Sequence, residues 1–279
     1  MKKIFLLLVL SIMIMPIIVS ADDTYYIDHG RTEITSQEYD NLLNLGFEER
    51  EIYGMSVDEF NANRNLTGEI IHEATLDLSE FPQLSLNPDR NIGGGLVNYS
   101  GIVGGTSGES AYKKLTVYII SINDGEYYRY KNTLEWKQIP SRRSWDIIAI
   151  GYDGAKLQLG ISTTFTQEWC NLYSECDSSF NANYYSISNA EVVVFKLPSG
   201  TLSSLSSYMY YSVIRRDTTQ PIATITALGD YAHATSNVST PPTSSNIMFL
   251  DEIWLTQHAT YYDSFPEIDA IANVNWGAW

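Results

Sequence analysis

The sequence predicts a mainly β fold: a two-sheet antiparallel β-sandwich or jelly-roll that carries a small N-terminal helical segment. Three observations lead to this class. Asp-Gly stands between apolar runs twice, at Asp124-Gly125 and Asp153-Gly154, and this dipeptide favours hairpin turns because both turn residues must reach positive φ. Eight or more short strand patterns recur along the chain. The sequence has no long amphipathic helical pattern, so two sheets packed together are the expected architecture.

The first 21 residues predict a secretory signal peptide. Lys2 and Lys3 supply a positive n-region, a nearly continuous apolar run follows, and the small residues that end at Ala21 fit a signal peptidase. The apolar run is short for a membrane span of roughly 20 residues and contains Pro16. We therefore expect cleavage after Ala21, a secreted, extracellular chain, and no stable membrane span after signal cleavage.

Charge narrows the class of partner. The chain has 17 Lys and Arg against 33 Asp and Glu. Removal of residues 1–21 takes away two lysines and leaves 15 basic and 33 acidic side chains, a net charge of −18. A surface this acidic repels nucleic acid and anionic lipid headgroups and favours cationic partners. The remaining length of about 258 residues suits one sandwich-sized domain with a small additional unit.

Residues 33–65 predict three very short helices. Thr35-Ser-Gln-Glu38 is a capping box that opens the first helix, and Gly46 stands where a helix ends in the left-handed conformation. Ser56-Val-Asp-Glu59 is a second capping box. A segment this small does not fold well by itself. We expect it to dock on the β domain; pairing with a partner and a pro-segment are the alternatives.

Residues 69–279 predict the β-sandwich domain. The expected strands begin with residues 69–78, 113–122, 126–136, 145–152 and 155–161, and continue with 190–197, 208–214, 221–228 and 247–255. The two Asp-Gly turns predict two hairpins in tandem. Residues 145–150 and 192–195 are apolar on both faces, which is typical of a central, fully covered strand.

Two further segments carry local predictions. Cys170 and Cys176 are the only cysteines of the chain, and an isolated pair in an exported protein predicts a disulfide bond. So short a loop gains roughly 2 kcal/mol from closure, so the bridge is expected to order a loop rather than hold the fold. The glycine-rich residues 91–110 predict a surface loop, with a substrate lid or a membrane-inserting hairpin as alternatives.

Two stretches of the sequence resemble a group of known proteins. Residues 35–60, which include Leu45-Gly46-Phe47, resemble a segment of uncharacterised secreted proteins of Firmicutes-type Gram-positive bacteria. Residues 130–148, which contain Leu-Glu-Trp and Arg-Arg-Ser-Trp-Asp, are similar to the same group. The two matches cover about a fifth of the chain. The resemblance implies an exported bacterial protein and no transferable activity.

Motif searches find no catalytic, metal-binding or cofactor-binding set. His72-Glu73 begins like a zinc-protease motif, but Leu76 stands where the second histidine ligand is required. Gly105-Thr-Ser-Gly108 lacks the second glycine of a nucleophile elbow. We therefore predict no metal and no cofactor, and we favour a noncatalytic protein over an enzyme.

Carboxylates beside tryptophans support one enzymatic alternative. Glu135, Asp251 and Glu252 lie in strand patterns next to Trp136 and Trp254. A glycosidase needs two carboxyl groups that flank the scissile bond and aromatic rings that stack on the sugar. A secreted carbohydrate-active hydrolase is therefore the second hypothesis. Solvent-facing acids on a half-buried sheet would produce the same pattern.

The candidate ligand-binding residues lie in and after the strand at residues 126–136. Alternation places four polar side chains together on one face of that strand: Tyr127, Arg129, Lys131 and Glu135. Arg142 and Arg143 follow shortly after and could grip a carboxylate or phosphate. From these two groups we select Tyr127, Arg129, Glu135, Arg142 and Arg143 as the candidate site.

Aromatic content supports a binding function. Twenty Tyr and six Trp are many for this length, and Tyr neighbours on a strand must face opposite sides, so some are exposed. Exposed aromatic rings suit sugars and protein partners. The leading hypothesis is a secreted, noncatalytic β-sandwich protein that binds glycan or protein, either polysaccharide or a cell-surface protein. A pore-forming, toxin-like protein that inserts residues 91–110 is the third.

Overall fold

A computed structural model describes residues 24–77, 112–250, 252–255, 261–264 and 268–276. The predictions for the signal segment and for residues 91–110 lie outside these ranges. Helices α2, α3 and α4 span Ser36–Asn44, Glu49–Gly54 and Val57–Asn63. The first strands are β1 (Tyr25–Ile27), β2 (Thr32–Ile34), β3 (Gly68–Asp77), β4 (Lys113–Ile122), β5 (Tyr127–Trp136), β6 (Trp145–Tyr152), β7 (Leu157–Asn171) and β8 (Cys176–Ser179). The remaining strands are β9 (Ala182–Ile187), β10 (Ala190–Lys196), β11 (Leu202–Arg215), β12 (Ile222–Ala234), β13 (Ile247–Leu250), β14 (Glu252–Leu255), β15 (Tyr262–Ser264) and β16 (Ile268–Trp276).

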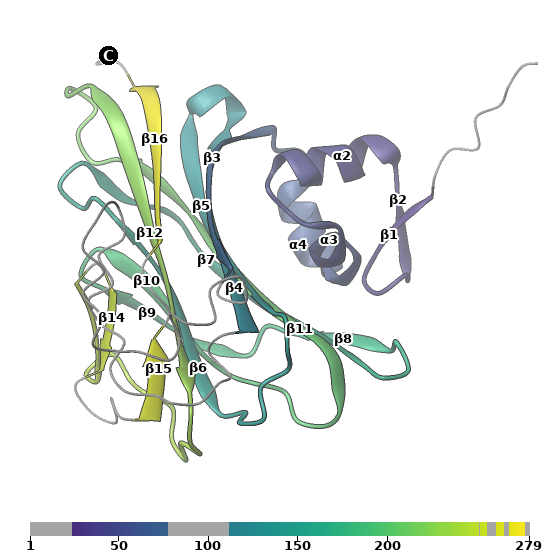
Figure 1. Ribbon diagram of the computed structural model, residues 1–279. Coiled ribbons are helices and arrows are strands. Elements are labelled where there is room, and N and C mark those ends of the chain that lie inside the picture. The colour runs from purple at the N-terminus through teal and green to yellow at the C-terminus, as the bar shows by residue number, and fades with distance from the viewer. Residues whose placement is uncertain (1–23, 78–111, 251, 256–260, 265–267, 277–279) are drawn as a thin grey trace, which may run out of the picture.

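Two six-stranded antiparallel sheets face each other and confirm the predicted sandwich class (Figure 1). The helix-side sheet has the strand order β3-β4-β5-β11-β7-β8. The other sheet is here called the hairpin-side sheet, because the β13–β14 hairpin packs on it. It has the order β15-β12-β6-β10-β9, and β16 also pairs with β12. The predicted hairpin of β4 and β5 forms through Asn123–Gly125, whose three residues all have positive φ.

The second predicted hairpin is wrong. β6 pairs with β10 and β12, whereas β7 pairs with β11 and β8, so the two strands lie in different sheets. Asp153 does shape a turn, because its Oδ1 accepts a hydrogen bond from the Ala155 amide at 3.1 Å. The turn carries the chain from one sheet to the other. An Asp side chain that accepts a hydrogen bond from the backbone two residues later is found in hairpin turns and in turns between sheets alike. The prediction that β6 is central is confirmed.

The main core lies between the two sheets and is mostly apolar. Each sheet contributes one face of its strands, as alternation along a strand requires. Its members from the helix-side sheet include Tyr130, Trp136, Phe165, Met209 and Tyr211, and those from the hairpin-side sheet include Ile148, Phe195, Tyr231 and Trp276. Some polar side chains lie within it: Asn132 of β5 donates to the carbonyl oxygen of Ala149 on β6 at 3.0 Å, and His233 Nδ1 of β12 lies 2.9 Å from Asp146 Oδ2 of β6.

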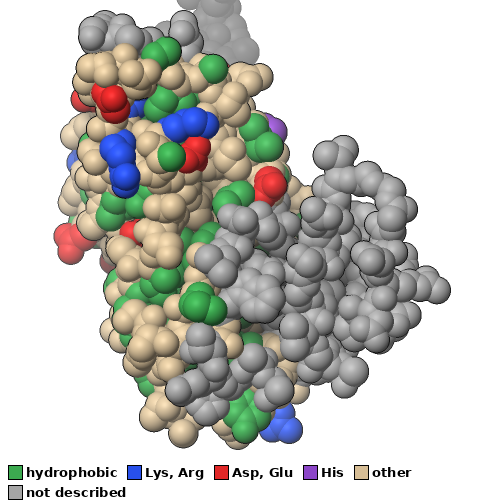
Figure 2. All heavy atoms as spheres, turned by 90° about the vertical axis from the view of Figure 1, so that its left-hand side faces the viewer, with side chains coloured by type: hydrophobic (Ala, Val, Ile, Leu, Met, Phe, Trp, Pro, Cys, Tyr) green, Lys and Arg blue, Asp and Glu red, His purple; other side chains and the backbone are tan. Residues whose placement is uncertain are grey.

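Both outer faces of the sandwich are covered as well. The β13–β14 hairpin packs on the hairpin-side sheet through Phe249 and Ile253. Val192 and Val194 of β10 belong to that second cluster, which is why residues 192–195 are apolar on both faces. On the described part of this side of the molecule, hydrophobic and charged side chains are interspersed (Figure 2).

The three predicted helices form and pack against the outer face of the helix-side sheet (Figure 1). Thr35 and Glu38 make the predicted capping box, and Ser56 accepts a hydrogen bond from the Glu59 amide at 3.1 Å. Gly46 has the expected positive φ of 79°. Leu42, Phe47, Ile52 and Phe60 of this segment share one cluster with residues of β4 and β11. The segment therefore docks on the β domain.

Candidate functional site

The strand face that the sequence predicts as a ligand site is covered by the helices. Arg129 and Lys131 are 3% and 0% exposed, although Tyr127, Arg129 and Glu135 do lie on one face of β5. Alternation correctly predicts which side chains are polar, but acidic residues of the helical segment, rather than solvent or ligand, meet this face. The prediction that this face of β5 is open to a ligand is therefore wrong. The ligand role of these residues stays a prediction without a surface to support it.

The selected arginines are not brought together with the face of β5. Tyr127 begins β5 and is half-buried, whereas Arg142 and Arg143 follow the other end of that strand. Arg142 is exposed. Arg143 is half-buried and donates to the carbonyl oxygen of Pro198 at 3.1 Å.

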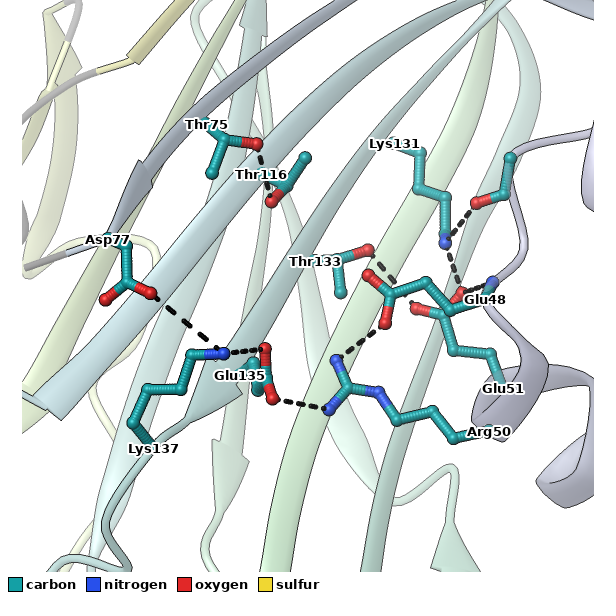
Figure 3. A network of polar contacts seen from close by, with 11 residues as sticks. Glu48, Arg50, Glu51, Thr75, Asp77, Thr116, Lys131, Thr133, Glu135 and Lys137 are labelled. Atoms are coloured by element: carbon teal, nitrogen blue, oxygen red, sulfur yellow. Dashed lines mark hydrogen bonds and ion pairs between the residues drawn. The ribbon is translucent and has the colours of Figure 1, made fainter. Parts of the chain in front are cut away.

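A buried ion pair joins α3 to β5 (Figure 3). Lys131 Nζ pairs with Glu51 Oε2, and both side chains are fully buried. Lys131 also donates to the carbonyl oxygen of Gly46 at 2.7 Å, and Thr133 Oγ1 donates to Glu51 Oε1 at 3.2 Å. A buried charge needs this degree of pairing, because leaving it without partners costs several kcal/mol.

Arg50 and Glu135 make a second, partly exposed link between the same two elements (Figure 3). Arg50 lies 3.5 Å from Glu135 Oε1 and 2.9 Å from Glu48 Oε2. Lys137 donates to the other oxygen of Glu135 at 2.8 Å. Although burial raises the pKa of Glu135, these cations lower it by more, so the net shift is downward. Glu135 is therefore an ionised partner in a salt-bridge chain, which does not suit a general acid.

The hydrolase pair suggested by the sequence does not assemble. Glu135 lies on the outer face of the helix-side sheet, and β14, which contains Glu252, packs on the outer face of the hairpin-side sheet. Both sheets and the core separate the two residues, whereas glycosidase carboxylates lie within roughly 10 Å of each other. Asp251 lies outside the described residues.

Two adjoining hollows lie at the far end of the helix-side sheet, around β7, β8 and the start of β11. The larger, here called the disulfide groove, has a volume of about 660 Å³. The smaller, here called the Glu168 pocket, has a volume of about 380 Å³. Trp169, Cys176 and Asp177 line both, so one ligand could occupy the two together.

The predicted disulfide forms and shapes one wall of the groove. Cys170 and Cys176 are bonded at the paired end of β7 and β8. Within the closed loop, Asn171 Oδ1 accepts hydrogen bonds from the amides of Tyr173 at 2.8 Å and Glu175 at 3.1 Å. Leu172 and Tyr173 project from this loop and are 66% and 87% exposed. The bridge therefore fixes the backbone from which two large apolar side chains project into solvent.

The Glu168 pocket lies between α3, the β1–β2 turn and the sheet. The turn is tied to α3 because the His29 amide donates to the carbonyl oxygen of Tyr53 at 2.8 Å. His29 Nε2 lies 3.3 Å from Ser178 Oγ on β8, which closes the other side. Burial lowers the pKa of His29, which favours the neutral imidazole.

Sequence reasoning missed Glu168, Tyr173 and Leu172. Glu168 stands in the polar run Thr166-Gln167-Glu168, where nothing marks its burial. Leu172 and Tyr173 did carry a signal, since an aromatic and an aliphatic side chain in a short disulfide loop have no core to fill.

Comparisons with known proteins name no family. No family model and no curated protein sequence matches the chain. Among solved structures, the collagen-binding domain from a Staphylococcus aureus adhesin matches over 52% of this chain and 88% of that domain, with 12% identity and a TM-score of 0.27. The KRT10-binding region domain of the pneumococcal serine-rich repeat protein PsrP matches over 43% and 77%, with 12% identity and a TM-score of 0.23. At such low TM-scores and identities the matches carry no information on ligand.

In the ranges that the structure describes, no helix has the length and apolar character that a membrane crossing requires. In the same ranges, no three His, Cys, Asp or Glu side chains are grouped so that they could hold a metal ion.

Proposed function

We propose that this is a secreted, noncatalytic binding protein that recognises a basic protein at the cell surface or in the extracellular medium through the disulfide groove. The observation that carries the proposal is the exposure of Tyr173, at 87%, on a loop that a disulfide and internal hydrogen bonds hold in place. Large exposed apolar side chains mark interaction sites when they are gathered on one surface.

The loop has the properties of a binding hot spot. Tyrosine is enriched among the few side chains that supply most of the energy of protein interfaces. Tyr173 and Leu172 are held by the closed loop, so less conformational entropy is lost on binding. A flexible loop with the same residues would bind more weakly.

Charge supports a basic partner. Glu175 and Asp177 line the groove, and Arg31 is the cation that lines it. The net charge of the chain without its signal segment is −18. Complementary charge increases the association rate and rejects acidic competitors.

A polysaccharide is the second candidate ligand. Trp169, Ser199 and Thr201 line the same groove. An aromatic ring beside hydroxyl groups suits a sugar, which needs an apolar platform and hydrogen-bond partners. This arrangement fits a neutral or amino sugar chain.

Binding of residues 22–279 to immobilised basic and acidic cell-surface proteins and to cell-wall polysaccharides tests the proposal. We expect saturable binding to basic proteins with no turnover, and Tyr173→Ala should weaken it about thirtyfold, as loss of a hot-spot side chain does. Tyr261→Ala is the matched control, because Tyr261 is also exposed, at 43%, and lies beside β15. Binding only to polysaccharide would favour the second candidate, and an unchanged affinity for Tyr173→Ala would overturn the site.

A further inference from the structure

The Glu168 pocket contains a carboxyl group whose hydrogen bonding is incomplete. Glu168 is 8% exposed, and its Oε1 is buried with no hydrogen-bond partner among the described residues. Its carboxyl group lies directly against Gly54, so that any side chain at position 54 would overlap it. A buried carboxyl oxygen without a donor is costly. A hydrogen-bond donor of a ligand that reaches Oε1 would remove the cost of leaving this oxygen unpaired.

The surroundings of the carboxyl group suit a cation. Glu49 and Asp177 also line the pocket and add negative charge. The Tyr53 ring, which is 44% exposed, meets the His29 ring edge to face at 5.9 Å and borders the opening. An aromatic face attracts a cation that passes over it.

Hydroxyl groups complete the set of acceptors. Ser204 and Ser206 of β11 line the pocket on the same side of the sheet as Glu168, because Ser206 is paired with Glu168 in the strand register. An ammonium group has three donors and a compact charge, which a carboxylate and hydroxyl oxygens can share. A guanidinium group pairs best with both oxygens of a carboxylate, whereas Oε1 is the Glu168 oxygen that is buried without a hydrogen-bond partner among the described residues.

Arg50 also lines the pocket but does not make it a site for anions. Its guanidinium group forms ion pairs with Glu48 at 2.9 Å and with Glu135 at 3.5 Å, although its Nε and Nη2 are buried without a hydrogen-bond partner among the described residues. Two carboxylates therefore offset its charge. The acceptor that remains is Glu168.

We propose that the Glu168 pocket binds the ammonium group of a lysine side chain of the protein partner, with Glu168 as its counter-ion and Tyr53 at the entrance. The inference rests on the proposed function, whose disulfide groove adjoins the pocket through Trp169, Cys176 and Asp177. The partner would contact Tyr173 in the groove and insert one lysine beside it.

Binding of lysine also changes the ionisation of Glu168. Burial raises the pKa of Glu168 well above its usual range; Glu51 on α3 and Glu59 on α4 add to the rise, while Arg50 on α3 and Lys131 on β5 oppose it. The free pocket therefore favours the neutral acid. An ammonium group favours the carboxylate, so binding should release a proton.

NMR of residues 22–279 with carbon-13 in the glutamate carboxyl groups tests the pocket with a small probe, Nα-acetyl-lysine methylamide. We expect the Glu168 signal, assigned by its loss in Glu168→Gln, to move from the position of a neutral acid toward that of a carboxylate as the probe is added. The same probe acetylated at Nε should leave the signal in place. Failure of the Glu168 signal to move at saturating probe would overturn the proposal.

Variants separate the pocket from a general effect of acidic surface. Glu168→Gln should weaken binding of the lysine probe at least tenfold, while Glu69→Gln, which changes an exposed acid on the opposite edge strand β3, should leave it unchanged. Tyr53→Ala should weaken binding several-fold and serves as the second variant. Equal weakening by Glu69→Gln would mean that only the net charge matters.

Failure of the lysine pocket and failure of the proposed function give different results. A partner protein that binds equally well after its lysines are acetylated would overturn the lysine pocket and leave the disulfide groove as the binding site. If no protein partner binds, the proposed function fails, and the probe measurement still decides whether the pocket accepts an ammonium group.

Discussion

The two faces of the helix-side sheet are buried in different ways. The inner face meets the hairpin-side sheet in a core filled by side chains such as Phe165, Phe195 and Tyr211. The outer face meets the helices through an ion pair between Lys131 and Glu51 and through further buried acids. Apolar packing makes most of the first contact, although the buried pair of Asp146 and His233 also lies there beside Trp136. At the second contact the charged pairs lie in the middle of the interface.

The contact between the helices and the sheet therefore depends on the charge state of its buried groups. Glu59 on α4 is buried, and its Oε2 accepts a hydrogen bond from Tyr208 OH at 3.1 Å. Arg129 lies with its guanidinium carbon 4.5 Å from the centre of the Tyr210 ring. Such groups specify where the helices dock, but each loses hydration in doing so. Conditions that change their charge should loosen the helices before they affect the sandwich.

The largest loss of stability is expected from the apolar core. Phe195 is 1% exposed, and its ring centre lies 4.6 Å from that of Phe165. Phe195→Ala leaves a cavity between two rigid sheets and should lower the free energy of unfolding by about 3–5 kcal/mol. Chemical denaturation measures the loss. A change below about 1 kcal/mol would contradict the view that packing dominates this face.

Loss of one partner of the buried ion pair should come next. Lys131→Met leaves the buried Glu51 without its cation and should cost about 3 kcal/mol. The double variant Lys131→Met with Glu51→Gln should recover most of the loss. Lys156→Met, which breaks the exposed pair with Asp153, is the control and should change stability by less than about 1 kcal/mol.

A third prediction concerns pH. Burial raises the pKa of Glu168 and of Glu59, so the folded protein holds protons that the unfolded chain releases near pH 4.5. The contribution of these two groups to stability is therefore fully present below that pH and falls as the pH rises toward the folded pKa values, by about 1.4 kcal/mol per pH unit for each proton. Glu168→Gln should remove one proton's share of this slope in denaturation curves. An unchanged slope would show that Glu168 is ionised in the folded state.

The smallest effect is expected at the start of α2. Thr35 Oγ1 accepts a hydrogen bond from the Glu38 amide at 3.2 Å, and Glu38 accepts one from the Thr35 amide at 3.0 Å. Thr35→Ala should lower the free energy of unfolding by about 1 kcal/mol. Ser36→Ala, one residue later, lacks this cap and should be near neutral. Similar losses in both variants would show that helix propensity, not capping, is measured.

Local patterns predicted most elements because their causes are local. Capping residues such as Thr35 and Ser56 bond within one turn, and two-faced apolar runs such as residues 192–195 need cover on both sides. The direction of the chain after Asp153 could not be predicted, since the same turn serves a hairpin or a change of sheet. Only the register of β6 and β7 with other strands decides between them.

The candidate site was harder to predict than the fold. Arg129 and Lys131 alternate with apolar residues as solvent-facing side chains do, and their acidic partner Glu51 stands 80 residues away from Lys131 in sequence. The burial of Glu168 on β7 results from α3, whose Gly54 lies against the carboxyl group. The sequence of a strand shows which of its faces is polar. It does not show which distant segment of the chain covers that face.

The docking of the helices also has a consequence for the order of folding. Glu59 bonds to Tyr208 across 149 residues of sequence, and Asn63 bonds to Tyr210 across 147. As the chain emerges from its N-terminal end, the helical segment appears early, yet the β11 surface that it needs is made much later. Contacts of such high sequence separation form slowly. Docking of the helices should therefore not precede the formation of β11, and in refolding experiments the tyrosine fluorescence of this contact should change no earlier than the circular dichroism signal of the sheets.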